Sequence, residues 1–68
     1  MNVVTVEVLL KWIEGTSGPD EPHNVTRARF HKHFEPGTPR EDFKEMERNF
    51  GTALILHAMK RRSANPGG

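Results

Sequence analysis

The apolar residues near the start of the chain recur with the spacing of a helix. Four of them fall at positions i, i+3, i+4 and i+7, namely Val6, Leu9, Leu10 and Ile13. Thr5 is placed to cap such a helix, and Gly15 is placed to follow its end. Residues 2–8 also alternate with the period of a strand and are rich in valine, so a hairpin strand is the alternative. We predict a helix, because more independent signals support it from Thr5 onward.

The apolar residues of segment 25–34 alternate with basic ones instead. The segment follows a loop, residues 15–24, that contains two glycines and two prolines. Read with period two, one face carries Ala28, Phe30 and Phe34, and the other carries Arg27, Arg29, His31 and His33. This alternation favours a short strand, which Pro36 closes. A helix would place Phe30 and Phe34 four residues apart and would make the domain all-helical, which is the alternative.

The clearest predicted element is a long helix over residues 38–62. Its start is marked by a capping box, Thr38-Pro39-Arg40-Glu41. Acidic residues in the first turn and basic residues in the last both complement the helix dipole. An apolar stripe follows, made of Phe43, Met46, Phe50 and either Leu54 or Ala53. Gly51 interrupts the middle, so either one helix passes through it or two shorter helices meet there.

Together these elements predict one small α+β domain over residues 1–62. The long C-terminal helix would pack on the N-terminal helix or hairpin strand and on the short strand. Residues 63–68 are expected to form a disordered tail. A chain of 68 residues buries only about 60% of the surface that it exposes when unfolded, so its stability is marginal. Self-association is one remedy available to so small a domain.

Composition and charge exclude several functions. The chain has no cysteine, so it forms no disulfide and offers no thiolate to a metal, which is compatible with a reducing compartment. No apolar run approaches the ~20 residues that cross a bilayer, and the start of the chain lacks the basic region of a signal peptide. We therefore expect a cytoplasmic protein without a membrane partner. A net charge of +1 does not require nucleic acid as a partner.

We expect neither an enzyme nor a cofactor. Ser17 and Ser63 lack the surroundings of a nucleophile elbow, and the glycines are scattered rather than gathered in a phosphate-binding loop. His31 and His33 have the strongest metal-like spacing, because on a strand both imidazoles would project to the same side. The sequence places no third ligand beside them, so we predict no metal site.

The basic residues suggest a nucleic-acid-binding regulator as the alternative function. The residues that would grip phosphates are Arg27, Arg29, Lys32, Lys60, Arg61 and Arg62. The interleaved Phe30 and Phe34 could stack on bases, but so small a core can hardly spare them. We therefore assign both phenylalanines to the core.

The run of apolar residues after Gly51 supports the preferred function. Consecutive apolar residues on a helix point in several directions, more than one small core can absorb. The candidate interface residues are Leu54, Ile55, Leu56 and Met59. We predict a small adaptor- or inhibitor-type protein-interaction module that uses this surface to bind another protein chain and that forms a homo-oligomer.

Overall fold

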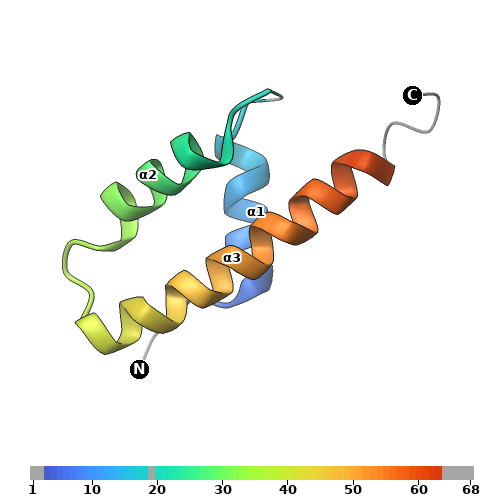
Figure 1. The fold of residues 1–68 in the computed structure, drawn as a ribbon. Coiled ribbons are helices and arrows are strands. Elements are labelled where there is room, and N and C mark those ends of the chain that lie inside the picture. Colours follow the sequence, from blue (N-terminus) through green and yellow to red (C-terminus); the bar gives the residue numbers. More distant parts are fainter. Residues whose placement is uncertain (1–2, 19, 64–68) are drawn as a thin grey trace.

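Three helices make up the protein (Figure 1). The computed structural model describes residues 3–18 and 20–63, except for the side chains of residues 62 and 63. Helix α1 spans Val6–Thr16, α2 spans His23–Phe34 and α3 spans Arg40–Ser63. Within these described residues there is no strand. The predicted α+β class is therefore wrong, and the all-helical alternative describes the fold.

Segment 25–34, predicted to be a short strand, forms most of α2. A lone strand would leave its backbone N–H and C=O groups unpaired, whereas a helix pairs them internally. The helix also places Thr26 and Phe30 four residues apart on its inner face, where both are buried. The alternation of basic residues was misleading because burial of these two side chains, and not the polar pattern, decides the conformation.

The predicted N-terminal helix is confirmed as α1. The Thr5 hydroxyl caps it by accepting a hydrogen bond from the backbone N–H of Val8, at 3.3 Å. The helix continues through Gly15 and ends at Thr16. Leu9 and Ile13, four residues apart, are its fully buried side chains.

Helix α3 runs without interruption through Gly51. It begins slightly later than predicted, since the backbone N–H of Phe43 donates to the carbonyl of Pro39 at 2.9 Å. The Thr38 hydroxyl donates to the carbonyl of Phe34 at 2.6 Å, and so ties the end of α2 to the start of α3. The predicted tail, 63–68, lies outside the described residues apart from the helical backbone of Ser63.

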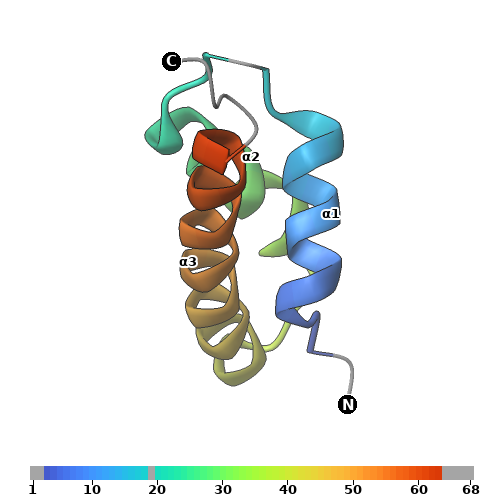
Figure 2. The ribbon, with the colours of Figure 1, turned by 90° about the vertical axis from the view of Figure 1, so that its right-hand side faces the viewer.

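Helices α1 and α3 lie side by side and run in the same direction (Figure 2). Two hydrogen bonds fix this register. The Asn49 side chain donates to the carbonyl of Val4 at 2.9 Å, and Lys60 Nζ donates to Glu14 at 2.6 Å near the other end. Helix α2 lies between α1 and α3 in the sequence and runs in the opposite sense, because the loops on either side of it are short.

The core is an aromatic cluster that joins all three helices. It contains the four phenylalanines and the single tryptophan of the chain: Trp12, Phe30, Phe34, Phe43 and Phe50. Phe30 and Phe50 are fully buried at its centre. Leu9, Ile13, Met46, Ala53 and Leu54 complete the buried set. The large rings fill the space between α2 and the other helices, so α2 is held by side chains.

Candidate functional site

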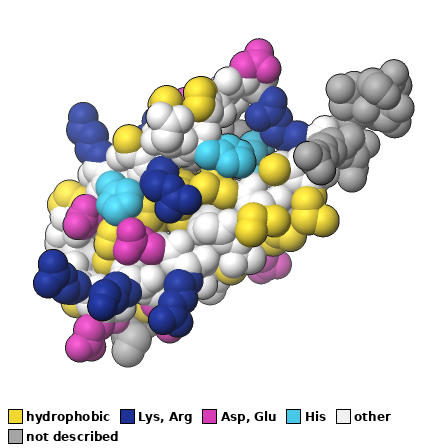
Figure 3. Space-filling model, viewed as in Figure 1, with side chains coloured by type: hydrophobic (Ala, Val, Ile, Leu, Met, Phe, Trp, Pro, Cys, Tyr) yellow, Lys and Arg dark blue, Asp and Glu magenta, His cyan; other side chains and the backbone are white. Residues whose placement is uncertain are grey.

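The candidate interface residues of α3 do not share one environment. Leu54 is 4% exposed and belongs to the core, whereas Ile55, Leu56 and Met59 are 64%, 40% and 57% exposed. This difference arises because successive residues of a helix are rotated by about 100°. Hydrophobic side chains gather over the C-terminal half of α3 in Figure 3. We call Ile55, Leu56 and Met59 the apolar patch.

The apolar patch ends a longer exposed stripe along the outer face of α3. At alternating intervals of four and three residues, the stripe contains Glu41, Glu45, Arg48, Thr52, Ile55 and Met59, all exposed. Its N-terminal half is charged, and its C-terminal half is uncharged and ends in the apolar residues Ile55 and Met59. This spacing keeps the six positions on one side of the helix, as in the seam of a coiled coil. Helices α1 and α2 pack on the opposite side of α3.

Arg29, a candidate phosphate ligand, is occupied by an internal ion pair. Its guanidinium donates to both carboxylate oxygens of Glu21, at 2.7 and 2.8 Å, and to the carbonyl of Thr16 at 3.3 Å. Thr26, which is buried, donates its hydroxyl proton to the same carboxylate at 2.7 Å and lies 3.2 Å from the Ser17 hydroxyl. Glu21 thus ties the end of α1 to α2.

The electrostatics of this network favour the ionised carboxylate. Hydrogen bonding from Arg29 and then from Thr26 lowers the pKa of Glu21 from its ordinary value of 4.5 to about 2. The same pair raises the pKa of Arg29, chiefly through the hydrogen bond to Glu21. Sequence reasoning missed Glu21, because a carboxylate between a turn and a proline carries no signal of its distant partner.

The remaining basic candidates do not form one surface. Arg27 lies over the Phe50 ring, with its guanidinium carbon 5.6 Å from the ring centroid, and Lys32 is exposed elsewhere on α2. Lys60 pairs with Glu14 at 2.6 Å, which lowers the pKa of Glu14. Arg61 lies 4.0 Å from Asp20. The side chain of Arg62 is outside the described residues.

His31 and His33 point to different neighbours, because two residues in a helix are separated by about 200°. The His33 ring stacks against Trp12 of α1, with centroids 5.9 Å apart. The His31 ring faces α3 and packs edge-on against Phe43 at 5.2 Å. The structure therefore does not bring the two histidines together.

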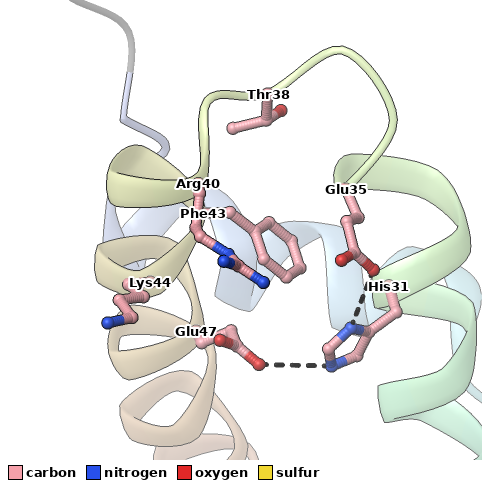
Figure 4. A pocket seen from close by; sticks show the side chains of 7 residues that line it. All are labelled: His31, Glu35, Thr38, Arg40, Phe43, Lys44 and Glu47. Atoms are coloured by element: carbon pink, nitrogen blue, oxygen red, sulfur yellow. Dashed lines mark hydrogen bonds and ion pairs between the residues drawn. The ribbon is translucent and has the colours of Figure 1, made fainter.

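His31 lines an open cavity of about 550 Å³ between α2 and α3 (Figure 4). Its Nδ1 lies 3.3 Å from Glu35 and its Nε2 lies 3.3 Å from Glu47. In Figure 4 the ring sits between these two carboxylates, and the Arg40 side chain points towards the cavity. Thr38 and Lys44 complete the lining. Two acidic and two basic side chains surround the imidazole, so the lining is balanced in charge.

Two absences complete the description of these surfaces. Among residues 3–18 and 20–61, whose side chains are described, no group of three or more histidine and carboxylate side chains is arranged to hold a metal ion. Within the same part of the chain, no helix has the length and apolarity needed to cross a membrane.

Comparisons of the chain with family models, with curated proteins and with solved structures find no match.

Proposed function

We propose that this protein is a small non-enzymatic interaction module that self-associates through the outer face of α3. The observation that carries the proposal is the apolar patch, in which Ile55, Leu56 and Met59 are all 40% or more exposed on neighbouring turns. The three helices already enclose a complete aromatic core on the other side of α3. A second protein surface is needed to remove these side chains from water.

The partner that fits this surface is a helix from a second copy of the chain. The exposed stripe of α3 has the four-and-three spacing by which one helix packs against another. Two copies of the apolar patch are self-complementary in a two-fold arrangement, since each supplies the same residues to the other. An antiparallel pairing centred on Ile55 and Met59 would also set the two helix dipoles in opposite directions.

The size of the patch predicts a weak complex. A stable interface buries about 800 Å² on each partner, which is more than three side chains provide. The pairing must therefore include polar neighbours such as Thr52. We expect a monomer–dimer equilibrium that responds to protein concentration and that is nearly insensitive to salt, because its centre is apolar.

The test is sedimentation velocity across a hundredfold range of protein concentration. The wild-type protein is expected to shift from monomer towards dimer as concentration rises. The double variant Ile55→Lys/Met59→Lys is expected to remain monomeric, because each contact would place like charges together. Lysine suits the last turns of a helix, so the variant retains its helicity.

The matched control is Val8→Lys. Val8 is 54% exposed, close to the exposure of Met59, but it lies one helical turn before Trp12 on the flank of α1 that faces α2. This variant is expected to associate as the wild type does. A wild-type protein that stays monomeric throughout, or a double variant that associates equally well, would refute the proposal.

A further inference from the structure

Three consecutive residues in the second half of α2 attach it to the rest of the protein. Arg29 forms the ion pair with Glu21 of the loop after α1. The Phe30 ring packs into the aromatic core. The His31 ring lies 3.3 Å from Glu47 of α3, across the cavity. The last of these contacts is the one whose strength depends on whether an imidazole is protonated.

The His31 ring lies between two carboxylates, and only its contact with Glu35 has hydrogen-bond geometry. Both ring nitrogens lie 3.3 Å from a carboxylate oxygen, one on Glu35 and one on Glu47. Ionised carboxylates only accept hydrogen bonds, and a neutral imidazole carries one N–H. The neutral ring can therefore donate to one of the two carboxylates and turns a lone pair towards the other. A doubly protonated ring presents an N–H to each carboxylate and is attracted to both charges.

The other charged groups at this cavity do not cancel the attraction between a protonated His31 ring and the two carboxylates. Arg40 and Lys44 of α3 line the same space and would oppose a charged imidazole. In Figure 4, however, the two carboxylates face the ring directly, while Lys44 points away from it. The ring is 37% exposed on an open cavity, so protons reach it without any unfolding.

We propose that His31 is a proton-dependent clamp that fastens the C-terminal half of α2 to α3. When the ring is doubly protonated its charge is attracted to Glu35 and to Glu47, and when it loses a proton the charge attraction that joins α2 to Glu47 of α3 is lost. The clamp is independent of self-association, because the apolar patch lies on the outer face of α3. Partly exposed ion pairs of this kind change a local equilibrium by about two- to fivefold.

The test is amide hydrogen exchange followed by NMR at pH 5.5 and pH 7.5, with rates corrected for intrinsic exchange. It is made in the Ile55→Lys/Met59→Lys variant, so that association plays no part. The amides at the end of α2 are expected to be about two- to fivefold better protected at pH 5.5. The Glu21 network is constant over this range, because the pKa of Glu21 is about 2.

Three further substitutions assign the effect. His31→Gln is expected to abolish the pH difference, and Glu47→Gln to reduce it. His33→Gln is the matched control, because His33 lies on the same helix but stacks on Trp12, and it is expected to keep the full difference. Equal protection at the two pH values without these substitutions, or a difference that survives His31→Gln, would overturn the proposal.

Discussion

The rings of Phe30 and Phe50 lie almost parallel, with their centroids 4.1 Å apart and their planes inclined by 11°. Both side chains are fully buried. This contact joins the middle of α2 to the middle of α3. Because α2 is only weakly amphipathic, with Thr26 and Phe30 as its buried residues, much of its attachment depends on this one ring.

Phe30→Ala is therefore expected to be the most damaging single change in α2. Removing a buried phenylalanine side chain lowers the free energy of unfolding by about 3–5 kcal/mol. That loss is comparable with the whole stability of a small domain, so the variant should be largely unfolded. Urea titration followed by the fluorescence of Trp12, which contacts Phe30, measures the effect. Val25→Ala on the exposed side of α2 should cost less than about 0.5 kcal/mol, and a similar small loss in Phe30→Ala would contradict this account of the core.

Substitution by alanine should have opposite effects on stability at Gly51 and at Gly37. Gly51 lies within α3 and a Cβ atom there would meet nothing within 4 Å. Gly51→Ala is expected to raise the free energy of unfolding by about 0.5–1 kcal/mol, because alanine has the higher helix propensity.

Gly37→Ala supplies the contrast. A Cβ atom at Gly37 also meets nothing within 4 Å, but φ is +82°, in the left-handed region. The substitution should lower the free energy of unfolding by about 1 kcal/mol. Thermal denaturation of both variants checks the pair, and stabilisation by both would contradict the positive φ in the α2–α3 loop.

Glu21 predicts how stability depends on acidity. Its pKa is about 2 in the folded protein, against an ordinary value of 4.5, so the folded state binds this proton less tightly than the unfolded state. The stabilisation that it provides is complete above about pH 4.5 and is lost as pH falls towards 2. Urea unfolding of the wild type at a series of pH values should show this loss.

The Glu21→Gln variant should lack that part of the acid dependence. Arg29→Met should remove most of it as well, because the hydrogen bond from Arg29 is the largest cause of the lowered pKa. If Arg29→Met retained the wild-type slope between pH 4.5 and 2, the ion pair would not be the source of the effect.

Asn49 should contribute more to the stability of the fold than an ordinary polar residue on a helix surface does. Its side chain donates a partly buried hydrogen bond to the carbonyl of Val4, which anchors the chain just before α1. Asn49→Ala is expected to cost about 1 kcal/mol, with faster hydrogen exchange at the start of α1. Asn24→Ala, at an exposed position near the start of α2, should leave exchange in α1 unchanged.

Local signals in the sequence were sufficient for α1 and α3. Thr5 caps α1 as its position indicated, and the stripe of Phe43, Met46 and Phe50 is buried as the helical spacing required. These features depend on neighbours within a few residues, so the sequence alone determines them. The sequence also showed that the apolar residues after Gly51 point in several directions, but it did not show which of them enters the core.

The tertiary structure decided the rest. Whether segment 25–34 is a strand or a helix depends on where Thr26 and Phe30 are buried, and their partners lie on other helices. The placement of Arg29 in an ion pair, of Leu54 in the core and of His31 between two carboxylates likewise depends on residues distant in sequence. Capping and periodicity act over single turns and are readable in order along the chain, whereas burial and charge pairing arise only once the three helices have packed together.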